Sequence, residues 1–108
     1  MSPKEALEYA QENGFSDKIR ELIYQDPETA YECAYSVDQE PKEDTRNAAC
    51  KDSQWAYFYA KNVDKEPRDD TREASCKNSY FACLYAQYVD REPRDDTREV
   101  ACKKLYSA

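Results

Sequence analysis

A stripe of small apolar residues recurs along the chain with the spacing of an α-helix. Three segments carry Ala, Ala and Val at positions i, i+4 and i+7, which places the three side chains on one helical face. The three sets are Ala30, Ala34 and Val37; Ala56, Ala60 and Val63; and Ala82, Ala86 and Val89. This pattern predicts helices at about 54–63 and 80–89, and an equivalent helix within 27–38.

A shorter helix is predicted before each of these segments. Pro41, Pro67 and Pro93 lie near its start, where a missing N–H costs little. The predicted bounds are 42–51, 68–77 and 94–104. Asp70 with Glu73, and Asp96 with Glu99, have the spacing of a capping box at the start of this first helix. Two-residue turns at Asp52-Ser53 and Asn78-Ser79 then supply good N-cap residues for the second helix.

The whole sequence repeats with a period of 26 residues. The segment Val63 to Cys76 recurs as Val89 to Cys102 with 11 of 14 positions identical, and Val37 to Cys50 matches the middle copy at 9 of 14. A fixed period of this size marks an array in which each unit buries its apolar face against the next. We therefore expect an all-α fold, an α-solenoid of short two-helix repeats with about eight helices.

One helical-repeat domain is expected over 1–108. Residues 1–14 form an N-terminal capping helix, opened by the capping box Ser2-Pro3-Lys4-Glu5 and ended near Gly14. The repeats are 15–38, 39–64 and 65–90, followed by an incomplete last repeat at 91–108. Three interpretations of that last segment remain open: a modified cap, part of a longer array, or an end that a partner covers.

The repeat unit also resembles a known family. The residues that carry the similarity are Asp70-Thr71-Arg72-Glu73-Ala74-Ser75-Cys76-Lys77-Asn78-Ser79, then Ala82 and Leu84-Tyr85-Ala86. They resemble tandem helical repeats of a bacterial and viral domain family of unknown function, with the rough pattern D-x-x-V-V-x-x-A-V-x-x-x-G-x-A-L-x-Y-A, whose paired valines and glycine are absent here. The similarity covers most of 17–108 and implies an α-hairpin array without an implied activity. Such repeats are also similar to hypothetical bacteriophage proteins.

Composition narrows the function classes. Charged residues make up 36% of the chain and the net charge is −7, which argues against direct binding of nucleic acid or an anionic membrane. No apolar run approaches the ~18 residues of a membrane span, no signal-peptide pattern is present, and a cytoplasmic location is expected. His is absent and Gly14 is the only glycine, so the common nucleophile pairs, phosphate loops and His-based metal sites are missing. We expect no enzyme activity, no cofactor and no metal.

The cysteines and the acidic loops are expected to have structural roles and to bind no metal. Cys50, Cys76 and Cys102 share one repeat position, but stacked helices lie ~8–10 Å apart, beyond the ~7 Å that a disulfide tolerates between Cα atoms. No zinc-type C-x₂₋₄-C spacing occurs. We expect a ladder of buried thiols, with a Cys76–Cys83 disulfide as the alternative. The acidic segments 64–70 and 90–96 lack the glycine of a calcium loop, so capping and solvation explain them.

An arginine recurs at the same repeat position. The four residues are Arg20, Arg46, Arg72 and Arg98. In a stacked array they form a row beside two rows of carboxylates, Asp69 with Asp95 and Asp70 with Asp96. We expect an Arg–carboxylate network between repeats, and the alternative is a row that grips an acidic ligand.

Large apolar residues occupy a flank of the second helix that is turned away from the Ala and Val stripe. They are Trp55, Phe58, Phe81, Leu84 and Tyr88, where the first repeat has Thr29, Glu32 and Ser36. This flank is either core between repeats or a partly exposed patch whose aromatic residues anchor a partner. Val100 and Leu105 add a second candidate surface, because the last predicted helix has no second helix to cover its apolar side.

These residues lead to two hypotheses about function. The first is a non-enzymatic scaffold that binds a protein partner, with possible self-association through the C-terminal end. Its predicted binding residues are Trp55, Phe58, Phe81, Leu84, Tyr88, Val100 and Leu105. The second is a small acidic phage-type inhibitor that mimics nucleic acid and blocks a host nucleic-acid-binding or defence enzyme. Residues 1–36 hold 3 basic and 8 acidic side chains, whereas 37–108 hold 13 and 15. A nucleic-acid mimic should spread its charge along the array, so this asymmetry favours the first hypothesis.

Overall fold

The computed structural model describes residues 1–90, and these residues are helical, without a strand. Seven α-helices are present in that range: α1 Pro3–Asn13, α2 Asp17–Ile23, α3 Pro27–Glu32, α4 Glu43–Ala49, α5 Ser53–Tyr59, α6 Asp69–Ser75 and α7 Ser79–Tyr85. The all-α prediction is confirmed for the described part of the chain. The predicted helix 94–104, with Val100 and Leu105, lies outside it.

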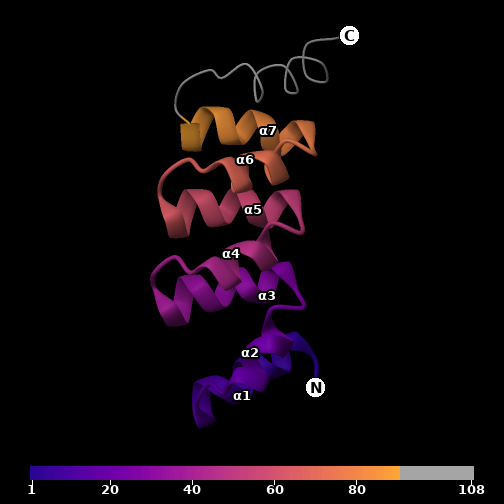
Figure 1. The fold of residues 1–108 in the computed structure, drawn as a ribbon, viewed down its shortest axis with the longest axis vertical. Helices are drawn as coiled ribbons and strands as arrows, with labels where there is room; N and C mark the ends of the chain where they lie inside the picture. The colour runs from indigo at the N-terminus through magenta and orange to yellow at the C-terminus, as the bar shows by residue number, and fades with distance from the viewer. Residues whose placement is uncertain (91–108) are drawn as a thin grey trace.

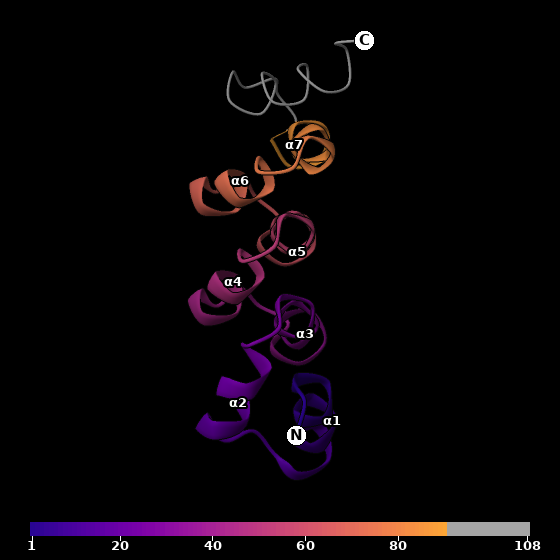
Figure 2. The same cartoon turned by 90° about the vertical axis from the view of Figure 1, so that its right-hand side faces the viewer.

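The helices follow one another along the long axis of the molecule in two columns (Figures 1 and 2). The predicted first helices α2, α4 and α6 form one column, and α3, α5 and α7 form the other, with α1 below α3. α1 begins at the predicted capping box, in which the Glu5 amide donates to Ser2 Oγ, and ends at Gly14, whose φ is 101°. The N-terminal helix therefore occupies the position of a second helix.

In the second column, α3, α5 and α7 each continue into a π-helical turn that ends at an aspartate. These turns are η1 Cys33–Asp38, η2 Ala60–Asp64 and η3 Ala86–Asp90. Gln39 and Lys65 follow η1 and η2 in the left-handed conformation, and their amides donate to the carbonyls of Ala34 and Ala60 at 2.8 Å. The wider turn rotates the final aspartate toward the first column. The apolar periodicity predicted these helices but not their π-helical ends.

The first helices α4 and α6 are capped by a tyrosine hydroxyl from the other column, which corrects the predicted capping box. Asp70 lies inside α6, and the N-cap is Arg68, whose side chain makes no cap bond. The Arg68 amide donates to the Tyr85 hydroxyl at 3.0 Å, and that hydroxyl lies 2.8 Å from Thr71 Oγ1. The arrangement is repeated at α4. There the Lys42 amide donates to the Tyr59 hydroxyl at 2.9 Å, and that hydroxyl lies 2.7 Å from Thr45 Oγ1. A distant side chain thus replaces the local cap.

Small residues fill the space between the columns. Ala30, Ala34, Ala56, Ala60 and Ala82 of the predicted stripe have no exposed surface. Tyr59 and Tyr85 are the largest fully buried side chains of the described residues. Short side chains bring the helices close enough for these tyrosines to reach the start of the neighbouring helix.

A buried ion pair joins the two columns at three places, and it differs from the predicted network. Arg20, Arg46 and Arg72 bind Asp38, Asp64 and Asp90, at 3.0, 2.6 and 2.8 Å. Each pair lies within one predicted repeat, because the π-helical turn brings the final aspartate over the arginine. The predicted partner Asp69 makes only an additional contact with Arg72 at 2.8 Å, and Asp70 pairs with Arg68. Arg98, Asp95 and Asp96 lie outside the described residues.

The cysteine prediction is only partly right. Cys33 is fully buried, but Cys50 and Cys76 are half-buried at the edge of the core, and Cys102 lies outside the described residues. Cys83 is a free thiol, so the alternative disulfide with Cys76 is not supported. Burial raises the pKa of the Cys50 thiol to about 11, which keeps it protonated at neutral pH.

Candidate functional site

An unbroken row of aromatic rings runs along the second column. Its ring contacts connect α3 and η1 to α5, and α5 to α7. From one end to the other the rings are Tyr35, Tyr31, Trp55, Phe58, Tyr57, Phe81 and Tyr80, with successive centroids between 5.0 and 6.1 Å apart. Contacts at these separations are favourable beyond the apolar area they bury. We call these seven residues the aromatic row.

The row is partly core and partly surface, and of the predicted flank residues only Tyr88 is exposed. Trp55, Phe58, Phe81 and Leu84 are half-buried against the core. Tyr35 and Tyr80 at the two ends of the row are 56% and 60% exposed, and Tyr88 beyond it is 51% exposed. The half-buried rings hold the exposed ones in place. Val100 and Leu105, the other predicted binding residues, lie outside the described residues.

Sequence reasoning missed four members of the row: Tyr31, Tyr35, Tyr57 and Tyr80. Tyr31 and Tyr57 occupy equivalent repeat positions, and Tyr35 follows Tyr31 by one helical turn. This spacing was the available signal, because i and i+4 side chains meet on a helix surface. These tyrosines lie next to positions of the flank, such as those of Trp55 and Phe58, and outside the pattern of large residues that predicts it.

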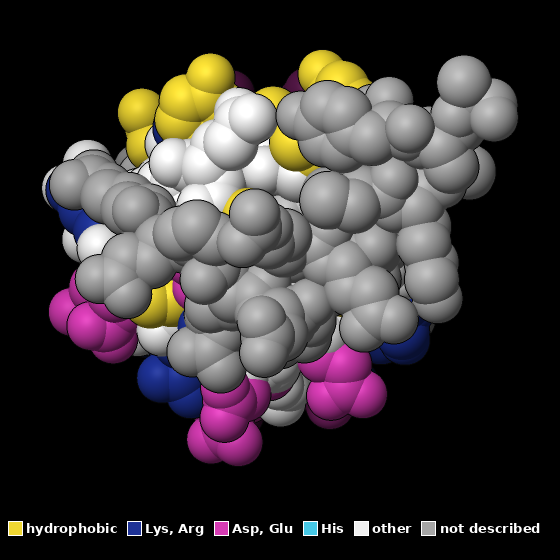
Figure 3. Space-filling view, turned by 90° about the horizontal axis from the view of Figure 1, so that it is seen from above, with side chains coloured by type: hydrophobic (Ala, Val, Ile, Leu, Met, Phe, Trp, Pro, Cys, Tyr) yellow, Lys and Arg dark blue, Asp and Glu magenta, His cyan; other side chains and the backbone are white. Residues whose placement is uncertain are grey.

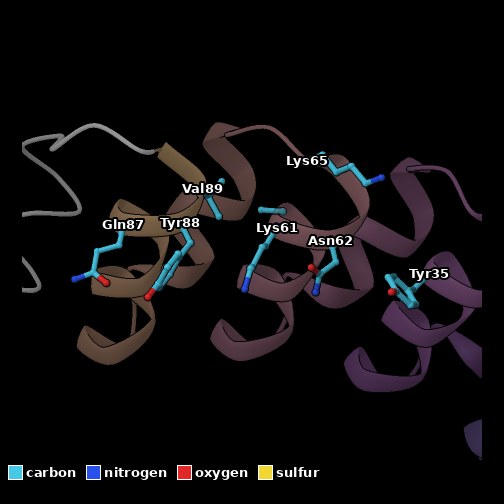
Figure 4. A pocket seen from close by; sticks show the side chains of 8 residues that line it. Tyr35, Lys61, Asn62, Lys65, Gln87, Tyr88 and Val89 are labelled. Atoms are coloured by element: carbon cyan, nitrogen blue, oxygen red, sulfur yellow. The ribbon is translucent and has the colours of Figure 1, made fainter.

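A groove opens beside the row, where the π-helical turns end (Figure 4). Its larger hollow has a volume of about 680 Å³, and its side-chain walls are Tyr35, Lys61, Asn62, Lys65, Gln87 and Tyr88. A smaller hollow of about 200 Å³ continues between η1 and η2 and shares Tyr35, Asn62 and Lys65. We call the two hollows together the terminal groove. Its size falls within the range of small-ligand and peptide sites.

The polar groups of the terminal groove are held by the aromatic row. Asn62 Nδ2 donates to the Tyr31 hydroxyl at 3.0 Å, which leaves the amide oxygen of Asn62 available. The Lys61 ammonium lies 5.2 Å from the Tyr88 ring centroid and 5.9 Å from that of Tyr57. These cation–π contacts orient the ammonium without neutralising it.

Acidic side chains of the first column lie away from the aromatic side. Figure 3 shows hydrophobic side chains along one edge of the molecule and Asp and Glu side chains along the opposite edge. Glu43, Asp44, Asp69 and Asp70 belong to the first turns of α4 and α6, in the other column. Negative charge in a first turn is favourable because it opposes the positive end of the helix dipole. These acids therefore have a structural role.

Within residues 1–90 no group of three or more His, Cys, Asp or Glu side chains is placed to hold a metal ion. In the same range, no helix combines the length and apolar character that crossing a bilayer requires. Burial also raises the pKa of the Cys33 thiol, which lowers its thiolate fraction at neutral pH. The features that remain as a candidate site are the aromatic row and the terminal groove.

Comparison with known proteins gives no relative: no protein-family model, no curated protein and no solved structure matches this chain.

Proposed function

We propose that this chain is a non-enzymatic helical-repeat scaffold that binds a protein through the exposed side of α3, α5 and α7. The observation that carries the proposal is the exposure of three tyrosines on this column: Tyr35 and Tyr80 at the two ends of the aromatic row, and Tyr88 beyond it. Tyrosines of this kind are frequent interface anchors, because they bury a large area at a small cost in side-chain entropy. The half-buried rings behind them supply a pre-organised base.

The scaffold part of the proposal is an α-solenoid of two-helix repeats. Equivalent contacts recur 26 residues apart: Tyr59 and Tyr85 bind their first helices in the same way, and Arg46 and Arg72 bind equivalent aspartates. Such recurrence is what a stack of near-identical units produces. Partners of solenoids bind across several units, and the aromatic row crosses three helices of one column.

The acidic inhibitor that mimics nucleic acid is the less favoured function. A mimic needs a regular display of accessible carboxylates. Asp38, Asp64 and Asp90, which recur at every unit, are instead buried and paired with arginine. Four acids of α4 and α6, Glu43, Asp44, Asp69 and Asp70, lie in first helical turns, where they oppose the helix dipole. Self-association through Val100 and Leu105 remains a prediction.

The proposal is tested by changing the three exposed tyrosines together. We expect the Tyr35→Ser, Tyr80→Ser, Tyr88→Ser variant to lose at least tenfold in affinity for the protein that the unmodified chain captures from its native cell extract, since each anchor contributes on the order of 1 kcal/mol or more. Captured protein is quantified by mass spectrometry at several bait concentrations.

The matched control is Tyr9→Ser, which removes a similarly exposed tyrosine from α1. Both variants should keep the helical circular dichroism spectrum of the unmodified chain. Equal capture by the triple variant and the unmodified chain would place the binding surface elsewhere.

A further inference from the structure

We propose that the terminal groove receives an acidic, extended peptide segment of the protein partner, with its carboxylates on Lys61 and Lys65. This inference rests on the proposed function and names the chemistry of the segment. It begins from a local charge that opposes the charge of the whole chain. The net charge is −7, yet the only charged side chains that line the groove within residues 1–90 are two lysines.

Both ammonium groups are available to a ligand. Among the described residues, neither Lys61 nor Lys65 forms an ion pair, whereas the nearby carboxylate of Asp64 is consumed by Arg46. Lys61 is held over Tyr88 and Tyr57 by contacts that keep its charge. Lys65 is exposed in the left-handed position that follows η2. The two positive charges therefore flank the larger hollow.

The remaining walls suit a peptide backbone with apolar side chains. The amides of Asn62 and Gln87 offer donors and acceptors to backbone groups, and the rings of Tyr35 and Tyr88 offer apolar contact (Figure 4). The groove crosses the ends of η1, η2 and η3. Neighbouring helices lie ~8–10 Å apart, so the groove is about 16–20 Å long. That length matches about five or six extended residues at ~3.3 Å each.

Differences between the repeats support a role in recognition. Residues that build the unit are the same in the second and third repeats, for example Arg46 and Arg72, or Tyr59 and Tyr85. Two groove positions carry a different residue in each repeat. One repeat position holds Tyr35, Lys61 and Gln87 in turn, and the next holds Ser36, Asn62 and Tyr88. A surface with only a structural role has no need of this local cluster of lysine, amide and tyrosine.

The test uses the full chain and a fluorescent octapeptide of alternating glutamate and leucine, with binding followed by fluorescence anisotropy. We expect saturable binding that weakens as salt rises, because the contacts are between exposed charges. The Lys61→Gln, Lys65→Gln double variant should bind at least tenfold more weakly. The control Lys51→Gln, Lys77→Gln removes the same charge from exposed turns on the way into α5 and α7 and should change affinity less than twofold.

Three results would overturn the inference: no saturable binding at about 1 mM peptide, an equal loss in the control variant, or equal lysine-dependent binding of a 20-residue oligothymidylate. The last result would assign the groove to a different polyanion. Failure here is distinguishable from failure of the proposed function. If capture of the partner depends on the three tyrosines and not on the two lysines, the scaffold proposal stands and the acidic segment is wrong.

Discussion

Replacing Asp64 by alanine is expected to lower the free energy of unfolding by about 3–5 kcal/mol, the usual cost of breaking a buried ion pair. The Asp64 side chain is 1% exposed and that of Arg46 is 10% exposed. Arg46 Nε donates to both carboxylate oxygens and its terminal nitrogen donates to one of them at 2.6 Å. These bonds raise the pKa of Arg46. Arginine is protonated at neutral pH even without a partner, so the guanidinium stays charged after the substitution and is left buried without its carboxylate. Urea unfolding followed by circular dichroism measures the loss.

Two control variants make the result specific. Asp44→Ala removes an exposed carboxylate from the first turn of α4 and should change stability by no more than about 0.5 kcal/mol. The double variant Arg46→Met, Asp64→Leu should recover most of the loss, because no buried charge remains. A loss below about 1 kcal/mol in Asp64→Ala would show that the pair is solvated and does not join the columns.

Replacing Tyr59 by alanine is expected to cost about 3–5 kcal/mol, the range for deleting a large aromatic side chain from a core. Tyr59 has no exposed surface, and the Arg46 guanidinium lies 5.7 Å from its ring centroid. Its hydroxyl also binds the amide and carbonyl of Lys42, the N-cap residue of α4. The substitution therefore removes core volume and the cap of the neighbouring helix together. Thermal and urea unfolding measure the effect.

The contribution of the cap is separated by Tyr59→Phe. This variant keeps the ring but leaves the Lys42 amide without its acceptor, and should cost about 1–3 kcal/mol. Tyr80→Ala is the matched control, since Tyr80 is exposed and should change stability by about 0.5 kcal/mol or less. If Tyr59→Phe is as stable as the unmodified chain, the hydroxyl does not cap α4.

Local patterns in the sequence predicted those elements whose stabilising contacts are themselves local. The Ala and Val stripe predicted α5 and α7, because it reports the buried face of the same helix. Asp52 and Asn78 cap those helices as predicted, each accepting from amides two and three residues further on. The Ser2 capping box is confirmed for the same reason.

Predictions failed where a distant residue replaces a local one. The Asp70 capping box was expected at α6, but the Tyr85 hydroxyl already satisfies the start of that helix. The sequence predicts arginine partners between repeats, because side-chain periodicity gives no indication that the second helix ends in a π-helical turn. That turn brings Asp64 and Asp90 back over the arginines of their own repeats.

The candidate site was predictable only in part. Trp55, Phe58 and Phe81 were identified from their size and position, but their exposure depends on how far each ring is covered by the next unit. Lys61, Asn62 and Lys65 belong to no motif. They become a group only when the ends of η1, η2 and η3 are placed side by side. Their one signal in the sequence is that these positions differ between otherwise similar repeats.

The claim that the second column is the binding side is tested most directly by site-specific photo-crosslinking. A benzophenone amino acid is placed at exposed Tyr88 in one variant and at exposed Glu73 on α6, in the other column, in a second variant. Both variants are irradiated in the native cell extract. The proposal predicts a discrete protein adduct from position 88 and none from position 73. Adducts from position 73 alone, or equally from both positions, would contradict it.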